Sequence, residues 1–451
     1  MPRTRTLFFA ALATGLVFIG VLVVTKLWPN HAEAPLRIWA TGTVVHVDTA
    51  QSSRVYLEYG TTRRYGLFST PSPVGSTHRF DLVGLSPGTR YHVRALARSG
   101  GGTLTAPDLV LDVADGPVFH SLRTIDDHFE LDGRPWIPRF TWGSCASSYA
   151  EEAAVGVNAF MSSNCGDSPE RQARAARRVG GVVIPALDQT NLSLPTTVAT
   201  YYADEPDLSQ IPPVQLAGDW NAHANAHGVP TFLTLSHLAT SGDPAMVATT
   251  AAYARLTDVL GIDIYPISTT NDPGQIVQVA AAQRTLRSLA GGKPTFQWIE
   301  AEQPTSDSGV ALTRAEIEAE AWMAIVNGAR GLGWWTYGTS PFSVSTAGRR
   351  ALTAVGVALD TFAPAIDAAT APVTLANGGV DVFATRRDGA LTVFAVNTNP
   401  ASAVHEIFTL PGLGRRPVRV WNTGRTIAAS RDTFADTLPP LGWRVYLVAP
   451  R

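Results

Sequence analysis

Lysine and cysteine are scarce in this sequence. Its 451 residues include only two lysines, Lys26 and Lys293, and two cysteines, Cys145 and Cys165. The formal net charge is −2, so the chain lacks the basic surplus with which proteins bind nucleic acid, and we expect no such partner. No His or Cys lies at metal-ligand spacing beside either cysteine, so we predict no metal site and no cofactor. The use of Arg in place of Lys is typical of GC-rich bacterial genomes.

Apolar and aromatic residues are plentiful. Apolar residues make up 45% of the chain, which includes eleven tryptophans. A chain of this length and composition is expected to form two to four domains with sizeable cores. Exposed tryptophan rings are common platforms for sugar rings, so the tryptophan content favours a carbohydrate ligand.

Residues 7–24 form an uncharged apolar run flanked by basic residues. The run is long enough to span a membrane and longer than the core of most cleaved signal peptides. Residues 32–34 resemble a cleavage site, but Pro35 would hinder processing there. We therefore expect residues 1–34 to be a transmembrane signal anchor and linker, with a removed signal as the alternative. Either way the protein is exported, to be held at the cell envelope by the membrane or secreted.

Short β-rich runs separated by turns occupy residues 35–115 and 371–451. Strands at this spacing predict a β-sandwich at each end of the exported part. In the first region, the leucines, proline and tyrosine of residues 82–91 resemble the corner of fibronectin type III domains, and residues 57–62 resemble the same family. That resemblance implies a spacer or docking module.

Between the two sandwiches, residues 116–370 alternate strands with mostly amphipathic helical segments. Eight such units predict a (β/α)8, or TIM, barrel. An open doubly wound sheet is the alternative, and it is disfavoured because no glycine-rich phosphate loop opens any helix. The strands are predicted at residues 136–141, 157–161, 182–186, 198–203, 230–235, 261–266, 294–300 and 331–337.

The active sites of TIM barrels lie at the carboxyl ends of the strands, where this sequence places acids and aromatics. Strand four ends at Asp204 and Glu205, and strand seven ends at Glu300. These two strands lie opposite each other, and alternation along each strand turns Glu205 and Glu300 into the mouth. A retaining glycosidase needs two carboxyl groups roughly 5 Å apart, one as acid/base and one as nucleophile. Glu302 is the alternative nucleophile.

The two cysteines follow the first two predicted barrel strands. In an exported protein Cys145 and Cys165 are therefore expected to form a disulfide.

Several motifs, in this order, resemble the large clan of retaining TIM-barrel glycoside hydrolases. They are the hairpin at residues 132–139, Tyr-Ala-Asp-Glu-Pro at 202–206, Gly-Ile-Asp-Ile-Tyr-Pro at 261–266 and Gly-Leu-Gly-Trp-Trp at 331–335. The resemblance implies that Glu205 is the acid/base and Glu300 the nucleophile. Asp204 stands where the clan usually carries an Asn that binds a sugar hydroxyl.

The same resemblance implies a set of substrate-binding residues. Tyr265 would contact the nucleophile, and Trp334 or Trp335 would form the floor of a sugar subsite, with barrel packing as the alternative role for all three. His237 would contact substrate or serve as a structural histidine. Asp263 would bind substrate or pair with Arg139 as a structural acid.

The sequence thus predicts an exported, membrane-tethered glycoside hydrolase whose partner is a carbohydrate. The alternative is a catalytically inactive glycan-binding or scaffold protein of the cell envelope, motivated by Asp204 and by the unusual Ile-Glu-Ala-Glu sequence at residues 299–302.

Overall fold

A computed structural model describes residues 36–41, 43–82, 85, 88–99, 102–113, 119–236, 244–302, 311–336, 342 and 344–450. The predicted N-terminal membrane anchor and His237 lie outside these ranges. In the described part of the chain, no helix combines the length and apolarity needed to cross a membrane.

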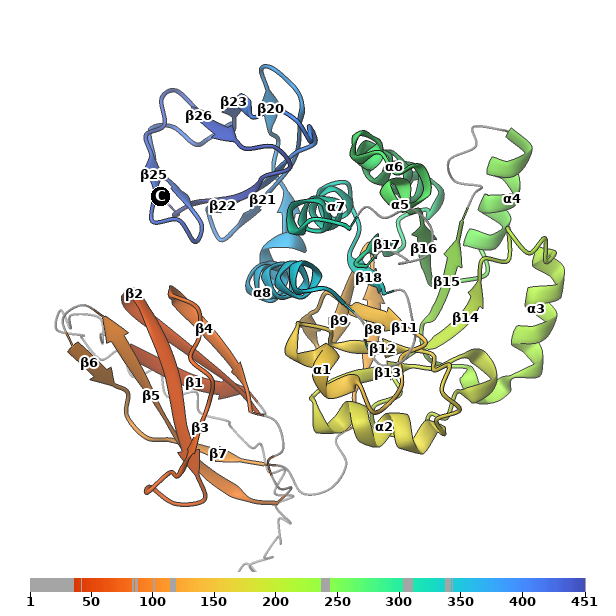
Figure 1. The fold of residues 1–451 in the computed structure, drawn as a ribbon, viewed down its shortest axis with the longest axis horizontal. Coiled ribbons are helices and arrows are strands. Elements are labelled where there is room, and N and C mark those ends of the chain that lie inside the picture. The colour runs from red at the N-terminus through yellow and green to blue at the C-terminus, as the bar shows by residue number, and fades with distance from the viewer. Residues whose placement is uncertain are drawn as a thin grey trace, which may run out of the picture.

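An antiparallel β unit precedes the barrel (Figure 1). Its central strand β2 is long and bent, and pairs with β1 and β4 along its first half and with β3 and β5 along its second. The interior is lined by alternating apolar residues such as Val45, Val47, Val55 and Leu57, all fully buried. The strands are β1 (Leu36–Thr41), β2 (Val44–Gly60), β3 (Leu67–Phe68), β4 (Gly75–Asp81), β5 (Arg90–Ser99), β6 (Gly102–Thr105) and β7 (Leu109–Asp112). The predicted β-rich module is therefore present, while its kinship with fibronectin type III domains stays a prediction.

Eight parallel strands form a nearly closed barrel in the order β13-β12-β11-β18-β17-β16-β15-β14. Isolated parallel bridges from Val183 to Thr197 and from Ala186 to Tyr201 join the two end strands. The strands are β11 (Arg139–Trp142), β12 (Ala159–Met161), β13 (Val182–Ile184), β14 (Thr200–Asp204), β15 (Thr231–Leu235), β16 (Val259–Asp263), β17 (Thr295–Glu300) and β18 (Gly331–Trp335). The barrel prediction is confirmed.

Helices cover the outside of the barrel (Figure 1). They are α1 (Tyr149–Ala154), α2 (Pro169–Arg178), α3 (Pro213–Ala222), α4 (Pro244–Ala254), α5 (Pro266–Thr270), α6 (Val277–Leu289), α7 (Arg314–Val326) and α8 (Thr346–Ile366). Short 3-10 turns occur at η1 (Leu187–Gln189), η2 (Ala224–Ala226) and η3 (Pro273–Ile276). Between β13 and β14 the chain forms η1 alone, with no α-helix among these fully described residues.

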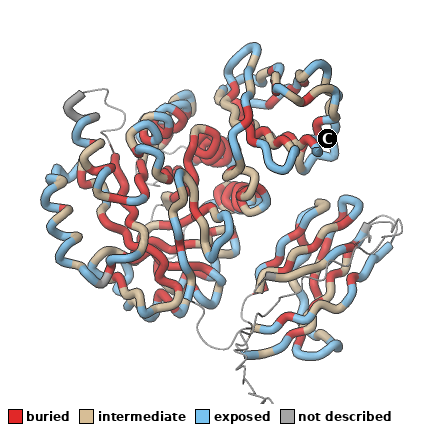
Figure 2. The backbone as a smooth tube through the Cα atoms, turned by 180° about the vertical axis from the view of Figure 1, so that it is seen from behind, coloured by how far each residue is buried: buried red, intermediate tan, exposed pale blue. Residues whose placement is uncertain are grey.

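The barrel interior is filled by aromatic rings. Phe140, Phe232, Phe296 and Trp298 pack edge-to-face or tilted, at centroid distances of 5.0 to 6.1 Å. Phe129 of the hairpin β8 (Leu122–Ile125) and β9 (His128–Leu131) stacks on Phe232. Burial is continuous through these strands (Figure 2). The β8–β9 hairpin covers one end of the barrel. The carboxyl ends of the strands therefore form the mouth at the other end.

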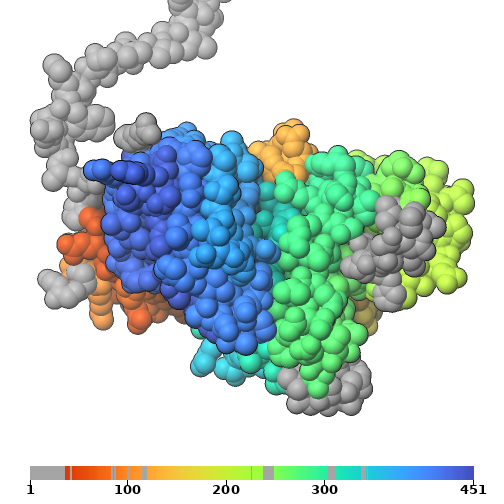
Figure 3. All heavy atoms as spheres, turned by 90° about the horizontal axis from the view of Figure 1, so that it is seen from above, coloured from red at the N-terminus to blue at the C-terminus, as the bar shows by residue number. Residues whose placement is uncertain are grey.

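The C-terminal part is a β-sandwich docked on the barrel helices α7 and α8 (Figures 1 and 3). One sheet has the order β19-β21-β22-β27-β24-β25 and the other β20-β23-β26. Trp443 stacks on Trp322 of α7 at 4.7 Å and donates from Nε1 to Glu318 at 2.8 Å. The strands are β19 (Ala369–Thr370), β20 (Thr374–Leu375), β21 (Val380–Arg387), β22 (Ala390–Asn397), β23 (Val404–Thr409), β24 (Val418–Val420), β25 (Thr426–Ile427), β26 (Thr433–Leu438) and β27 (Trp443–Val448). The short β10 (Arg134–Pro135) pairs with β9.

Candidate active site

A β-bulge at Tyr202 determines how strand β14 presents its acids. The pairing with β15 advances by one residue there, from Tyr201–Phe232 to Ala203–Leu233. Tyr201 packs in the barrel interior, whereas Ala203 packs against the outer cluster around Leu233. Since the bulge shifts the alternation by one residue, Asp204 returns to the side of Tyr201. Regular alternation would turn Asp204 to the wall, on the face opposite to Glu205, and the bulge reverses that orientation.

Asp204 is held at the mouth by a hydrogen-bonded chain that rises from the barrel interior. Trp298 Nε1 donates to Thr234 Oγ1 at 3.0 Å, and this oxygen lies 2.9 Å from Tyr201 Oη. Tyr201 Oη in turn donates to Asp204 Oδ1 at 2.6 Å. Partial desolvation, together with the charges of Glu205 and Asp207, raises the pKa of Asp204, while the Tyr201 hydrogen bond favours its ionised form.

Glu205 reaches the mouth through an unusual backbone conformation. Its φ is +42°, in the left-handed region that non-glycine residues rarely adopt, and its N–H donates to Thr234 O at 3.0 Å. The side chain, partly exposed, hydrogen-bonds to Asp263 at the end of β16. Strained residues of this kind cluster at functional sites.

Glu205 and Asp263 form a hydrogen-bonded carboxyl pair in which Asp263 holds on to its proton. Burial raises the pKa of Asp263, and the hydrogen bond to Glu205 and the negative charges of Glu205, Asp204 and Asp207 raise it further. Two carboxylates in hydrogen-bond contact do not both ionise near neutral pH. The pair therefore supplies one acidic proton at the mouth. The expected pairing of Asp263 with Arg139 is wrong, because Arg139 lies at the start of β11 and bonds to Asp360 at 2.9 Å.

Aromatic rings line the mouth beside these acids. Tyr265 stacks on Trp335 with centroids 4.6 Å apart, and Trp142 packs edge-on against Tyr201 at 4.9 Å. Burial and the surrounding acids, first Asp263, raise the pKa of Tyr265, so its hydroxyl stays neutral and available as a donor. Tyr265 and Trp335 thus lie together just after β16 and at the end of β18, and the role of Trp335 in a sugar subsite stays a prediction.

Glu300 does not open into the mouth as expected. Its exposed fraction is 0%, and its two carboxyl oxygens accept hydrogen bonds from the start of α5. Ile267 N donates to Oε1 at 2.9 Å, while Ser268 N and Oγ donate to Oε2 at 3.0 and 2.9 Å. Burial raises the pKa of Glu300 to about 7 against the effect of these donors. The carboxyl group is therefore occupied in positioning α5 and is closed to a substrate in this conformation.

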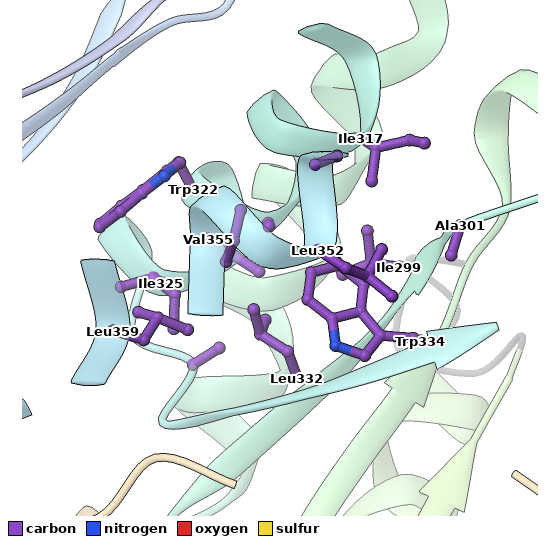
Figure 4. Packing of buried hydrophobic residues seen from close by; sticks show 14 of the residues in the cluster. Ile299, Ala301, Ile317, Trp322, Ile325, Leu332, Trp334, Leu352, Val355 and Leu359 are labelled. Atoms are coloured by element: carbon purple, nitrogen blue, oxygen red, sulfur yellow. The ribbon is translucent and has the colours of Figure 1, made fainter. Parts of the chain in front are cut away.

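Two further predicted site residues, Trp334 and Glu302, are engaged in other contacts. Trp334 has an exposed fraction of 0%, and its ring lies among Ile299, Leu332 and Leu352 between barrel and helices (Figure 4). Neighbouring residues of a strand point to opposite faces, so only Trp335 of the pair reaches the interior side. Glu302 accepts from Ser345 N at 2.5 Å and holds the start of α8.

Cys145 and Cys165 form the expected disulfide, with Cα atoms 5.4 Å apart. It ties the segment after β11 to the segment after β12, at the rim of the mouth. In the described ranges no group of three or more His, Cys, Asp or Glu side chains is arranged to hold a metal ion.

Sequence reasoning missed the residues that support the acids. Tyr201 and Thr234 were assigned only as strand formers, and both oxygens of Asp207 accept from Ser236 N at 3.2 and 3.0 Å, fixing the end of β15. Glu320 of α7 is buried and accepts from Glu300 N at 3.2 Å. The only available signal was the presence of acids in apolar surroundings, as for Glu320 between Ala319 and Ala321.

Comparison with known proteins gives structural neighbours but no sequence relatives. The chain matches no protein-family model and no curated protein. Solved structures that resemble it include a GH30 endoxylanase from Clostridium papyrosolvens, with 16% identity, a TM-score of 0.40, and 74% of this chain and 100% of that one covered. An alpha-amylase from Geobacillus thermoleovorans has 10% identity, a TM-score of 0.41, and coverage of 70% and 100%. A β-glucuronidase from Ruminococcus gnavus has 11% identity, a TM-score of 0.39, and coverage of 71% and 67%.

These structural neighbours are glycoside hydrolases. At such identities and TM-scores the likeness assigns neither an activity nor a catalytic residue to this chain, so any function has to be argued from the site.

Proposed function

We propose that this protein is a glycoside hydrolase. The observation that carries the proposal is the hydrogen-bonded pair of Glu205 and Asp263 beside Asp204, in a mouth walled by Tyr265 and Trp335. Acetal hydrolysis needs a protonated carboxyl to help the leaving oxygen depart and an ionised carboxylate near the developing positive charge. Aromatic faces and acids together suit a polyhydroxylated ring.

In the proposed reaction Glu205 donates the proton of the pair to the glycosidic oxygen as the bond from that oxygen to the anomeric carbon breaks. Asp263 supports this role because burial keeps a proton on the pair at neutral pH. Asp204, whose ionised form the Tyr201 hydrogen bond favours, stabilises or attacks the cationic anomeric carbon. Water then supplies the hydroxyl of the new reducing end and returns a proton to the pair.

Reducing-end release from a panel of polysaccharides tests the proposal. Glu205→Gln is expected to lower the rate by about 10²–10⁴-fold, the usual contribution of a general acid. Glu302→Gln is the matched control and is expected to retain activity, because the Glu302 carboxylate is engaged by Ser345 N at the start of α8. Equal loss in both variants would contradict the assignment.

The burial of Glu300 favours a second candidate, a glycan-binding protein without hydrolytic activity. Glu300 at the end of β17 is closed off by α5, which removes the expected nucleophile. This candidate predicts retarded migration in polysaccharide-containing gels and no new reducing ends after prolonged incubation.

We further propose that the protein acts outside the cytoplasm, tethered to the membrane by residues 7–24. The apolar run and the Cys145–Cys165 disulfide support this, since disulfides persist in oxidising compartments. Fractionation of cells, with protease added to intact cells or spheroplasts, tests the orientation.

A further inference from the structure

A cavity of about 530 Å³ lies at the edge of the barrel, apart from the acids of the mouth. It is lined by Pro169 at the start of α2 and by residues 188–193 after β13. Both segments follow the carboxyl ends of their strands, so the cavity opens at the same end of the barrel as Asp204 and Glu205. Its volume is in the range of small-ligand sites.

The cavity exists because the connection from β13 to β14 carries no α-helix. The three residues of η1 replace the helix that would otherwise pack beside α2. The loop that remains is nevertheless fixed in place. Thr190 Oγ1 bonds to Ala186 O at 3.0 Å and lies 2.8 Å from Thr200 Oγ1, while Asn191 Oδ1 accepts from Ser193 N at 3.1 Å.

The lining is polar and carries no cationic side chain among its described residues. Asp188 and Ser193 are exposed, and Gln189 contributes a buried Oε1 that has no hydrogen-bond partner within the described part of the chain. A buried amide oxygen without a donor is costly, and a turn of the Gln189 side chain towards the cavity would let a ligand hydroxyl satisfy it. Amide, hydroxyl and carboxylate groups together fit a neutral sugar better than an anionic one, which Asp188 would repel.

Strand β14 gives the separation between the cavity and the acids. Thr200, which contacts Thr190, stands four residues before Asp204, about 13 Å along the strand at the usual rise per residue. An oligosaccharide spans such a distance and a single sugar does not.

We propose that this cavity is a distal subsite that binds a neutral sugar unit of an extended glycan whose scissile bond lies at the mouth. This inference rests on the proposed function for the identity of the ligand. It adds the substrate class, a neutral chain of several sugar units rather than a disaccharide.

Binding of oligosaccharides to the full-length Glu205→Gln protein tests the subsite without turnover. The probes are short and long members of the xylo-, cello- and chito-oligosaccharide series, measured by calorimetry. Two variants change the cavity: Ser193→Trp fills it from an exposed position, and Gln189→Ala removes the unpartnered oxygen. Gln215→Ala, on the exposed face of α3, is the control.

The parent protein is expected to bind long members of one series about ten-fold more tightly than short ones, a preference worth about 1.4 kcal/mol. Both cavity variants should lose this preference while binding of short members and the control stay unchanged. A length preference that survives Ser193→Trp overturns the subsite, as does a parent that shows no preference or binds none of the three series.

Hydrolysis of the same oligosaccharides by the protein with Glu205 intact separates the two proposals. If the cavity variants abolish length-dependent binding and the protein does not hydrolyse the oligosaccharides, the subsite stands and the hydrolase proposal falls. If the protein hydrolyses these oligosaccharides and Ser193→Trp does not change the length dependence, the hydrolase stands and the subsite is removed.

Discussion

Asp263 lies within hydrogen-bond contact of Glu205, and its replacement tests the proton of the pair. In Asp263→Asn the amide still donates to Glu205, but the carboxyl group whose pKa burial and neighbouring charge raise is gone, so the pair loses its acidic proton at lower pH. We expect kcat/KM at pH 7 to fall about 100-fold and the alkaline limb of the pH profile to move to lower pH. An alkaline limb that stays in place in Asp263→Asn would argue against the pair as the source of the proton.

Glu300 predicts a dependence of stability on pH. Its pKa rises from 4.5 in the unfolded chain to about 7 in the folded protein, so the folded state binds the proton more tightly. The contribution of Glu300 to the unfolding free energy is therefore fully present below pH 4.5. It declines as the pH rises to 7 and does not change further above pH 7. The total loss is roughly 3 kcal/mol, at about 1.4 kcal/mol per pKa unit.

Urea unfolding at pH 5 and pH 8 measures this effect. The difference in unfolding free energy between the two pH values should be smaller in Glu300→Gln than in the unmodified protein. A change in stability that the substitution causes equally at both pH values does not affect this comparison. The same difference in both proteins would show that Glu300 does not titrate in this range.

Alternation along the strand predicted Glu205 at the mouth, but in the structure Glu205 reaches the mouth through its positive φ and not through alternation. The bulge at Tyr202 has no signal in the sequence, and it brings Asp204 to the interior side. The burial of Glu300 could not be predicted from its own strand either, because the groups that donate hydrogen bonds to its carboxylate belong to helix α5. Trp334 was different. The pleat alone separates it from Trp335, so its burial was predictable.

At the scale of elements, glycines in the strands make room for the aromatic core of the barrel. A Cβ built on Gly333 would lie 2.2 Å from the Trp298 ring, and one on Gly261 would lie 2.0 Å from the Phe296 ring. Since Trp298 also donates to Thr234, these glycines support the chain of hydrogen bonds that reaches Asp204.

Gly333→Ala is therefore expected to destabilise the protein by about 1–3 kcal/mol, the usual cost of overpacking. Activity should fall too, because the Trp298 ring must move. Thermal unfolding and kcat provide the readouts, with Gly218→Ala in α3 as the control, where a Cβ meets no atom within 4 Å. A Gly333→Ala protein as stable as the control would refute the packing argument.

The eight strands were predictable because each carries a buried apolar run bounded by turn residues. The missing helix after β13 was also visible, as a polar stretch with Asn and Pro at residues 188–195. The cavity beside it was not predictable, because it depends on how that loop packs against α2.

At the scale of the whole molecule, the barrel is braced by its neighbours. Trp322, Trp421, Trp443, Phe362 and Phe394 form a continuous aromatic contact between the helices and the C-terminal sandwich. On the other side, Asp360 of α8 accepts from Arg79 of the first β unit and from Arg139 of the barrel. The order of these modules was predictable from composition, whereas the docking surfaces were not, since packing between domains has no local signal.

Trp443→Ala is expected to lower the unfolding free energy by about 3 kcal/mol, because it removes a large ring and leaves Glu318 without its indole donor. Trp443→Phe keeps the stacking and should cost about 1 kcal/mol. Denaturant unfolding distinguishes the two variants. Equal stability of both variants and the unmodified protein would mean that the sandwich does not brace the barrel.

The release of reducing ends from neutral polysaccharides by the Glu205→Gln protein, compared with the unmodified protein and with Glu302→Gln, tests the central claim most directly. The account predicts hydrolysis by the unmodified protein and by Glu302→Gln, and a loss of at least about 100-fold in Glu205→Gln with the fold intact. Full activity in Glu205→Gln would contradict it.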